Sequence, residues 1–536
     1  STNRMSKKKR RGISLPLSLI LLLTFIPCKS MPKESSSSHE KPPNFVILML
    51  DDHGWGDVGA NWNSTRETPH IDKLAKRGIR FTDFHVGFSV CTPSRAALLT
   101  GRLAPRTGVG SNFSPFSKYG MAREEMIIPQ YLEDAYDSHL IGKWHLGHNA
   151  PYHPTYRGFN TFVGLPYSGD MGCLDSTPQG CKKTYNRSIS QPACPAFCPK
   201  DADAAASSHY HSNDNDDVKS PMTAIPLYNT KGANCEGLES CSSTISMQPF
   251  LPFNLTRKYI DHAKGVFQRR AKDASSKPFF LYVAFAHPHT PLFYDPKFSN
   301  SSSRPGFKKR YGNTLAEADA AIGEIYSSLE EHGLAKDTLV FITSDNGPAN
   351  VGSVDCDDIA HTYTCLSTGS VGPYLGSWQT RSKSRGGGGG GGTAKDTNWE
   401  GGHRVMGLAV WDGVIRGDRV SNALVSSLDL LPTIVSLSGK QLKPDRSYDG
   451  MDISPLLFGK TDKAHETLFH PASSTEITAM RYRNYKAHFR TYGQQPCRLP
   501  NGTHLPVGDS MVHNPPLVFD LDQDPAESQP IDPGSQ

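Results

Sequence analysis

The sequence predicts an α/β fold in which a large mixed, mostly parallel sheet lies between layers of helices. Continuous apolar runs, which suit strands buried on both faces, alternate along the chain with amphipathic stretches of helical period. Beyond about Leu442 this alternation gives way to short strands and turns. We therefore expect a smaller C-terminal α+β subdomain, built on an antiparallel sheet, after the main sheet.

Four apolar runs are the expected strands of the main sheet, and polar residues follow each of them. The runs cover residues 44–50, 139–142, 279–286 and 339–343. The residues that follow are Asp51-Asp52, Lys143-Trp144-His145, His287-Pro288-His289 and Ser344-Asp345-Asn346. Because open α/β sheets bind ligands beyond the carboxyl ends of their strands, these residues predict the functional site. Adjacent carboxylates repel each other, which favours a bound cation at Asp51 and Asp52 over the alternative of an Asp-rich turn.

Amphipathic helices fill the intervals between the strands. Residues 313–331 place Leu315, Ile322 and Leu329 on one face, and Gly333 is a stop signal. Residues 255–270 form a second expected helix. In the C-terminal subdomain, residues 485–491 and 516–521 are the candidate strands.

Residues 1–30 have the pattern of a cleaved secretory signal peptide. A basic segment at 7–11 precedes a short apolar run at 13–26, and Cys28-Lys29-Ser30 offers a small-residue exit. The apolar run is too short to span a bilayer, so we expect no transmembrane anchor. The alternative, a nuclear-localisation signal, is disfavoured by the same apolar run. Residues 31–43 are a polar linker.

The net charge does not indicate a nucleic-acid partner. The chain has a formal charge of +5, but residues 1–30 carry seven Lys and Arg and no Asp or Glu, which leaves the remainder near −2. The basic balance therefore belongs to the signal segment, and we expect no binding to nucleic acid.

The cysteines fit a protein of the secretory pathway. Of the eleven, Cys28 lies in the signal segment, and eight lie in local clusters: Cys173, Cys181, Cys194, Cys198, Cys235, Cys241, Cys356 and Cys365. Clusters of this kind favour disulfides, and the first four are spaced irregularly for the alternative of a metal site. We interpret residues 167–250 as a disulfide-stapled insertion over the strand ends. Six sequons predict a glycosylated surface, at Asn63, Asn112, Asn186, Asn254, Asn300 and Asn501.

Residues 386–392 are seven consecutive glycines. A Gly-rich loop binds phosphate only when it joins a strand to a helix in a defined pattern. This homopolymer lacks such a pattern, so we predict a flexible loop.

The stretch Cys91-Thr92-Pro93-Ser94-Arg95 places a cysteine at a helix start. Pro93 suits the first position of a helix, and Ala96 to Leu99 are good helix formers. Free N–H groups and the helix dipole at such a position favour an anion or a nucleophile, and Arg95 lies one turn further on the same face. For Cys-x-Pro alone, a buried or disulfide-bonded cysteine would be the more ordinary interpretation.

The motif continues as Leu98-Leu99-Thr100-Gly101-Arg102 and then resembles the sulfatase signature. From about Asn44 to Ile531 the chain resembles the sulfatases of the alkaline-phosphatase-like superfamily, most of all the arylsulfatase A group and next the galactosamine-6-sulfatases. Supporting stretches are residues 142–147, 399–402, 426–433 and 485–489. The resemblance implies a catalytic domain over 44–441, a C-terminal subdomain over 442–536, and hydrolysis of sulfate monoesters of carbohydrates, glycolipids or aryl alcohols.

The resemblance also implies the chemistry of the site. Formylglycine-generating enzyme oxidises the residue matched by Cys91 to Cα-formylglycine, whose hydrate attacks sulfur. One divalent cation, calcium with magnesium as the alternative, is held by the residues matching Asp51, Asp52, Cys91, Asp345 and Asn346. An all-oxygen ligand set fits a hard cation on chemical grounds as well.

The remaining roles are carried over in the same way. The resemblance assigns catalysis to Arg95, His145 and His289, and sulfate binding to Lys143, Lys395 and Ser168. In that scheme Arg95 holds the hydrate, His145 lies beside it, and His289 protonates the leaving group. His289 is preferred to His287 because the family pattern is His-x-Pro and Pro291 follows.

Disulfides mark one departure from the family. The resemblance implies nested bridges Cys173–Cys198 and Cys181–Cys194, and leaves Cys235–Cys241 and Cys356–Cys365 as local pairs. The arylsulfatase A group has a cysteine two residues before the lysine matched to Lys395, where this chain has Thr393. Cys497 therefore lacks its family partner and is either a free thiol or a bridge between chains in a homo-oligomer.

Two other functions compete with a sulfatase. One is a phosphomonoesterase or phosphodiesterase of the same superfamily, which uses Ser or Thr as nucleophile and often two metals. The other is an inactive extracellular matrix or carbohydrate-binding protein with unmodified Cys91. The clustered carboxylates disfavour this alternative, because an inactive site does not need them. In each case we expect the secretory pathway, with an extracellular or lysosomal destination.

Overall fold

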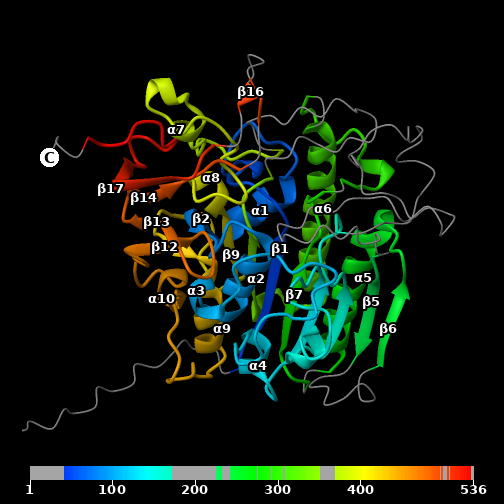
Figure 1. Ribbon diagram of the computed structural model, residues 1–536. Coiled ribbons are helices and arrows are strands. Elements are labelled where there is room, and N and C mark those ends of the chain that lie inside the picture. The colour runs from blue at the N-terminus through cyan, green and yellow to red at the C-terminus, as the bar shows by residue number, and fades with distance from the viewer. Residues whose placement is uncertain are drawn as a thin grey trace, which may run out of the picture. The chain divides into compact units, whose positions relative to one another are not determined.

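The computed structural model describes residues 41–171, 225–231, 242–273, 276–290, 292–305, 308–349, 368–494, 497–498, 504–505 and 508–532 (Figure 1). All the elements below belong to one compact unit, Pro42–Gln536. The main sheet has eleven strands: β1 (Asn44–Leu50), β2 (Ile79–His85), β3 (Asp137–Gly142), β4 (Thr161–Gly164), β5 (Leu227–Lys231), β6 (Ser242–Met247), β7 (Phe279–Ala284), β8 (Thr338–Ser344), β9 (Arg404–Val410), β10 (Arg419–Ser421) and β11 (Val425–Ser426).

The strand order is β10-β2-β9-β8-β1-β7-β3-β4-β5-β6, and β11 also pairs with β2. β1 is parallel to both of its neighbours, and Met49 pairs with Ala284 on one side and with Thr343 on the other. β3 continues the parallel set beside β7, whereas β9 is antiparallel to β2 and β8. The carboxyl ends of β8, β1, β7 and β3 therefore lie side by side. This confirms the predicted mixed, mostly parallel sheet.

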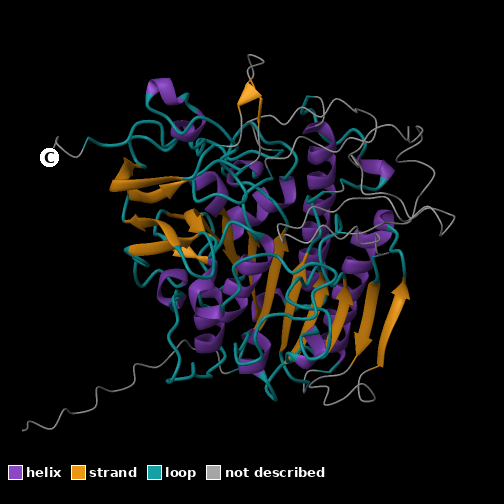
Figure 2. Cartoon of the chain, in the orientation of Figure 1, coloured by secondary structure: helices purple, strands orange, loops and turns teal. Residues whose placement is uncertain are grey.

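Helices cover both faces of this sheet, as Figure 2 shows. α1 (Pro69–Arg77), α5 (Leu255–Lys272) and α6 (Lys308–Glu331) pack on one face, and α2 (Cys91–Thr100), α4 (Ile128–Leu132), α9 (Leu430–Leu437) and α10 (Ser454–Leu457) pack on the other. In β1, Val46, Leu48 and Leu50 join the first core, while Phe45, Ile47 and Met49 join the second. Burial on both sides explains why this strand is continuously apolar.

Short helices complete the chain. The α-helical ones are α3 (Ala104–Thr107), α7 (Ser377–Thr380) and α8 (Glu400–His403). The 3-10 helices are Trp55–Asp57, Pro154–Tyr156, Pro252–Asn254, Pro296–Phe298, Ala335–Asp337, Lys383–Arg385 and Ser427–Asp429. None of the helices in the described ranges is long and apolar enough to cross a membrane.

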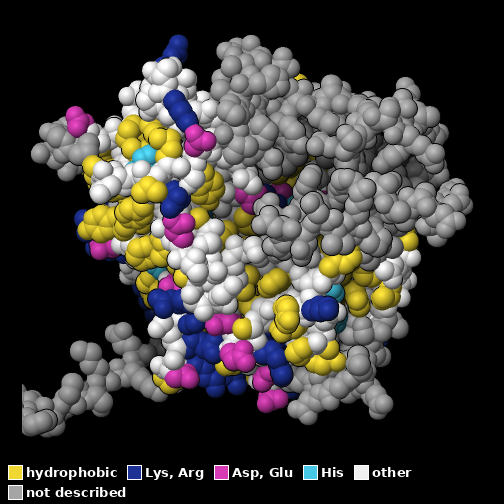
Figure 3. All heavy atoms as spheres, viewed as in Figure 1, with side chains coloured by type: hydrophobic (Ala, Val, Ile, Leu, Met, Phe, Trp, Pro, Cys, Tyr) yellow, Lys and Arg dark blue, Asp and Glu magenta, His cyan; other side chains and the backbone are white. Residues whose placement is uncertain are grey.

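A second, antiparallel sheet follows in the C-terminal part, with strand order β12-β13-β14-β17. Its strands are β12 (Thr467–Pro471), β13 (Ile477–Tyr482), β14 (Tyr485–Thr491) and β17 (Met511–Asp520), and β15 (Cys497–Arg498) pairs with β16 (His504–Leu505). The outward face carries exposed apolar side chains, namely Phe469, Tyr482, Tyr485 and Phe489. Figure 3 shows yellow, apolar atoms over this part of the molecule. The predicted C-terminal antiparallel sheet is confirmed.

The glycine run, expected as a flexible loop, is hydrogen-bonded along its length. The amides of Gly386 to Gly390 donate to carbonyls of residues 378–383, and the amide of Gly392 donates to the carbonyl of Gln494 at 2.6 Å. The side chain of Gln379 donates to the carbonyl of Gly390 at 3.0 Å. These bonds place the run against the residues that follow β14.

Several predictions lie outside the described residues. They are the signal peptide and most of the linker, most of the Cys-rich insertion, the eight clustered cysteines, and the sequons Asn186 and Asn501. The backbone of Cys497 lies in β15, and its side chain is likewise outside the described part. The other four sequon residues, Asn63, Asn112, Asn254 and Asn300, are exposed, as a glycan requires.

Candidate active site

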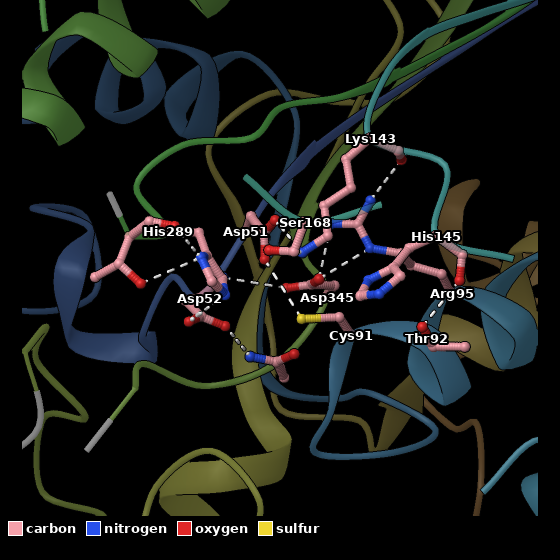
Figure 4. A network of polar contacts seen from close by, with 12 residues as sticks. Asp51, Asp52, Cys91, Thr92, Arg95, Lys143, His145, Ser168, His289 and Asp345 are labelled. Carbon is pink, nitrogen blue, oxygen red and sulfur yellow. Dashed lines mark hydrogen bonds and ion pairs between the residues drawn. The ribbon is translucent and has the colours of Figure 1, made fainter. Parts of the chain in front are cut away.

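Cys91 is the first residue of α2, so the helix begins two residues before Pro93, the residue expected at its first position (Figure 4). Val90 is the extended N-cap residue, and the amide of Thr92 donates to the Oδ1 atom of Asn112 at 3.0 Å. Gly101 ends the helix in the left-handed conformation, with φ 65°. The sequence of this helix thus presents the buried Cys91 side chain at its N-terminus.

The polar ends of β1 and β8 meet at Cys91. The register pairs Leu50 with Ser344, so Asp51-Asp52 and Asp345-Asn346 leave the sheet side by side. The amide of Asp52 donates to Asp345 Oδ1 at 3.1 Å, and Asp52 itself has a φ of 60°. Asp51 Oδ1 lies 3.7 Å from Cys91 Sγ. Three carboxylates with almost no solvent exposure therefore share one small volume.

Arg95 connects the strand ends at the site through its guanidinium group. Its guanidinium donates twice to Asp345 Oδ2, at 3.0 and 2.7 Å, and once to the carbonyl of Lys143 at 2.8 Å. The same group lies 3.3 Å from Asp51 Oδ2. Because Arg95 has 0% exposure, Asp345 and Asp51 offset the charge of its guanidinium in place of water. Arg95 thereby ties α2 to the ends of β8, β1 and β3.

Two lysines reach the carboxylates of the site, and each contacts a different one. Lys143 Nζ lies 2.7 Å from Asp51 Oδ2 and 3.2 Å from Ser168 Oγ. Lys395 Nζ lies 2.6 Å from Asp52 Oδ1 and 3.3 Å from Cys91 Sγ. Burial alone would lower the pKa values of both lysines, but the adjacent carboxylates raise them, so both lysines are cations. Burial would raise the pKa of Asp51, but Lys143 outweighs this effect together with the other nearby cations, and the pKa of Asp51 falls to about 2.

The two predicted histidines differ in what their rings can do. The Nε2 atom of His145 lies 3.1 Å from the carbonyl of Phe113, and no described residue partners its Nδ1 atom. Burial, reinforced by Lys143 and Arg95, lowers the pKa of His145 well below its usual value. The ring is therefore neutral, and donation from Nε2 leaves Nδ1 as a free base.

His289 faces the carboxylates from the loop after β7. Its Nδ1 atom lies 2.6 Å from the carbonyl of Thr290, and its Nε2 atom lies 3.2 Å from Lys395 Nζ and 3.4 Å from Asp52 Oδ2. His287 instead lies near Thr256 of α5, with its Nε2 atom 3.4 Å from the hydroxyl. Of the two histidines, His289 is the one beside Lys395 and Asp52.

The unmodified Cys91 thiol is a poor nucleophile in this setting. Burial raises the pKa of Cys91 far above its usual value, in spite of the two lysines. Cys91 is a free cysteine, and its side chain is not bonded to another cysteine. The helix N-terminus therefore does not produce a thiolate at Cys91.

The residues present fit a hard divalent cation. Ligand atoms of Asp51, Asp52, Cys91 and His289 all lie within 4.8 Å of one another. Asn346 donates from Nδ2 to Asp52 Oδ1 at 2.6 Å, while its buried Oδ1 atom has no partner among the described residues. Clustered carboxylate oxygens and a spare amide oxygen are the donors that calcium and magnesium prefer. The structure thus brings together all five predicted ligand residues and adds His289 beside them.

Two acidic residues of this region were missed by sequence reasoning. Asp170 receives a hydrogen bond from Ser168, and Asp396 receives one from the side chain of Gln494. The only sequence signal for either was its neighbour, since Asp170 lies two residues after Ser168 and Asp396 directly follows Lys395.

Family comparison covers almost the whole catalytic part. The sulfatase family matches residues 43–440, and the C-terminal region of aryl-sulfatase matches residues 463–536. Together these two matches include every site residue described above.

Curated relatives and solved structures give the same result. Arylsulfatase G of Homo sapiens is 39% identical over 93% of this chain and 85% of its own length, and arylsulfatase A of Homo sapiens is 34% identical over 91% and 83%. The crystal structure of PsFucS1 sulfatase from Pseudoalteromonas sp. superposes with a TM-score of 0.68 at 26% identity, covering 91% of this chain and 86% of that one. The chain therefore belongs to the sulfatase family, as an arylsulfatase-type enzyme that hydrolyses sulfate esters.

Proposed function

We propose that this sulfatase hydrolyses sulfate monoesters of carbohydrates, glycolipids or aryl alcohols at the site built around residue 91. The observation that carries the proposal is Cys91 itself, a buried free cysteine at the start of α2 with Lys395 Nζ at 3.3 Å and Asp51 Oδ1 at 3.7 Å. Oxidation of Cys91 to formylglycine supplies a hydrated aldehyde, one hydroxyl of which attacks sulfur while the other later expels sulfate and restores the aldehyde.

The charge balance of the site supports this assignment. Asp51, Asp52 and Asp345 are offset by Arg95, Lys143 and Lys395. A divalent cation, a singly charged sulfate ester and an ionised hydrate add no net charge to this set. Since unbalanced charge in a buried site is costly, the site is suited to take up these groups together.

The lysines and Arg95 bind and orient the reacting groups. Lys143 lies beside Asp51 and Lys395 beside Asp52, and each can donate to a sulfate oxygen, which offsets charge that develops there. Ser168, 3.2 Å from Lys143 Nζ, is a further donor. Arg95 holds residue 91 against the carboxylates. Asp51, Asp52, Asp345, Asn346 and residue 91 would hold calcium, or alternatively magnesium, which when bound lowers the pKa of the attacking hydroxyl.

The two histidines move the protons. As the S–O bond to the alcohol breaks, His289 gives a proton from Nε2 to the leaving oxygen. His145 then takes a proton on Nδ1 from the second hydroxyl of the hydrate, and the C=O bond forms as sulfate departs. The free Nδ1 atom of the neutral His145 ring supports this division of roles.

The modification is tested by the mass of the tryptic peptide Phe81–Arg95 from protein made in a eukaryotic secretory host. We expect residue 91 to have lost sulfur and gained an aldehyde oxygen. An intact thiol in active protein would overturn the proposed nucleophile.

Cys91→Ser tests the need for two hydroxyls. Serine can attack sulfur but has no second oxygen with which to expel sulfate, so we expect a trapped sulfated enzyme and at most one turnover. Mass spectrometry after incubation with an aryl sulfate would detect the adduct. Sustained turnover by this variant would contradict the mechanism.

The competing functions are separated by one comparison of substrates. Sulfate and phosphate esters of the same aryl alcohol should differ strongly in kcat/KM, with the sulfate preferred. Preference for the phosphate would favour the phosphoesterase, and no turnover of either would favour the inactive binding protein. We further propose maturation by formylglycine-generating enzyme in the secretory pathway, with an extracellular or lysosomal destination.

A further inference from the structure

The sulfate-binding lysine lies on a segment that runs from the site to the C-terminal sheet. The amide of Lys395 donates to the carbonyl of Pro348 at 3.1 Å, and that of Asp396 donates to the carbonyl of Ser89 at 2.9 Å. Residues 397–403 then lead through α8 into β9. Only four residues lie between Lys395 and Glu400. Whatever holds residues 398–400 therefore constrains where the ammonium group of Lys395 can lie.

Asn398 is attached to two strands of the C-terminal sheet. Its Nδ2 atom donates to the carbonyl of His470 in β12 at 2.9 Å and to the hydroxyl of Thr478 in β13. Its Oδ1 atom lies 2.8 Å from Nε2 of His403, at the end of α8. The side chain is 3% exposed, so the sheet and α8 satisfy its polar atoms in place of water.

Trp399 packs on the other two strands of that sheet. Its ring centroid lies 4.3 Å from that of His488 in β14 and 5.9 Å from that of Phe519 in β17. The side chain is buried, with 1% exposure. Consecutive residues 398 and 399 thus contact all four strands.

Glu400 adds a buried ion-pair cluster. Its carboxylate lies 2.8 Å from Lys486 Nζ and 3.2 Å from both Arg481 and Arg404, and its amide donates to Glu527 at 2.8 Å. His85 and His470 lie close enough to suggest a metal site with Glu400. Because three cations already surround that carboxylate, a further cation would be repelled, and an ion-pair cluster is the better description.

We infer that the C-terminal sheet positions Lys395 for sulfate binding, and that Asn398 is a positioning residue through which it does so. The inference rests on the proposed role of Lys395. A displacement of about 1 Å is enough to weaken a contact that has to reach a particular oxygen, so anchors three to five residues away matter to binding. The sheet would then contribute to the sulfate site through its contacts with residues 398–400.

The test measures inorganic sulfate as a competitive inhibitor of aryl sulfate hydrolysis by the full chain. Asn398→Ala should raise the Ki for sulfate about tenfold. Thr478→Val, which removes only the hydroxyl on the sheet side, should raise it by a smaller factor and serves if Asn398→Ala does not fold. Lys395→Met should raise the Ki by itself, and Asn398→Ala should add little in that background, because the two changes act through the same ammonium group.

Asp429→Asn is the matched control. This buried carboxylate accepts from the amides of Ser426 and Met451 and lies 2.6 Å from His465 Nε2. The Asp429→Asn substitution should lower the melting temperature without changing the Ki for sulfate. If Lys395→Met raises the Ki and neither Asn398→Ala nor Thr478→Val does, the positioning role is wrong and the proposed function stands. If Lys395→Met leaves the Ki unchanged, the assignment of Lys395 and the positioning role both fail.

Discussion

Asp52 shows how much of the site depends on one residue. Its left-handed backbone, with φ 60°, turns the carboxylate back toward Cys91 after β1. That carboxylate then lies 2.6 Å from Lys395 Nζ, 2.6 Å from Asn346 Nδ2 and 3.4 Å from His289 Nε2. Asp52 therefore joins the proposed sulfate-binding, metal-binding and proton-donating groups.

Asp52→Asn should weaken calcium binding at least about tenfold, because a neutral amide replaces one of the carboxylate ligands. Calcium at one hundred times its Kd would stabilise the wild type by about 2.7 kcal/mol, and a tenfold weaker site would lose roughly 1.4 kcal/mol of that. Melting temperatures with calcium and with a chelator measure the difference. Asp449→Asn, which removes a carboxylate paired with Arg106, is the control and should keep the full calcium response. An equal response from Asp52→Asn would remove Asp52 from the ligand set.

The sequence could reveal a site residue only where a local pattern marks it. Cys91 and Arg95 lie in one local motif, and Asp51-Asp52 stand out because paired carboxylates follow a buried strand. Lys395 needed the resemblance, since a lysine beside a glycine run carries no local signal. Asp396 and Asp170 were missed because only the folded chain brings them toward the site.

At the scale of elements, the glycine run packs closely against the chain that follows β14. Gly391 has φ 78°, and a Cβ atom there would lie 2.5 Å from the backbone of Gly493. Three residues after Gly392, whose amide bonds to Gln494, the chain reaches Lys395. The run thus allows two backbones to approach more closely than any larger residue would permit.

Gly391→Ala should destabilise the protein by about 3 kcal/mol or more, because overpacking adds to the cost of a left-handed alanine. Gly386→Ala is a matched control, since Gly386 has φ 73° with nothing within 4 Å of a Cβ atom, and it should cost only about 1 to 2 kcal/mol. Urea unfolding measures both values. Equal costs would mean that the contact with Gly493 is not tight. Gly391→Ala should also lower kcat/KM, whereas Gly386→Ala should not.

The strands and helices were predictable where burial is symmetrical. The predicted strand at 44–50 is reproduced residue for residue, since burial on both faces makes every position after Asn44 apolar. The last strand was predicted to begin at Pro516, but β17 begins at Met511 and contains Pro515 and Pro516. It lies at the edge of its sheet, where proline removes no ladder hydrogen bond that the sheet needs. The helix predicted at 313–331 in fact begins at Lys308. The prediction missed its first turn because the sequence there lacks the apolar period of a helix.

At the scale of the whole molecule, buried histidines couple stability to pH. His139, His153 and His403 lie in separate places, in β3, before β4 and at the end of α8. Burial lowers the pKa values of His139 and His403 to about 3 and that of His153 to about 4. In the unfolded chain each would titrate near its ordinary value of about 6.5. Below that pH the unfolded state therefore binds more protons than the folded state, and stability falls as the pH falls.

The expected loss is about 1.4 kcal/mol per pH unit for each histidine, or roughly 2 kcal/mol each between pH 7.5 and pH 5. His139→Gln should therefore reduce the drop in unfolding free energy between these pH values by about 2 kcal/mol, although it also loses the 2.8 Å contact of His139 with Thr161 Oγ1. His70, whose side chain is exposed, supplies the control His70→Gln, which should leave the drop unchanged. Urea unfolding at both pH values separates the two effects, since the lost contact lowers stability equally at each pH, and only a lost titration changes the difference. An unchanged difference for His139→Gln would show that this histidine is protonated in the folded protein at pH 5.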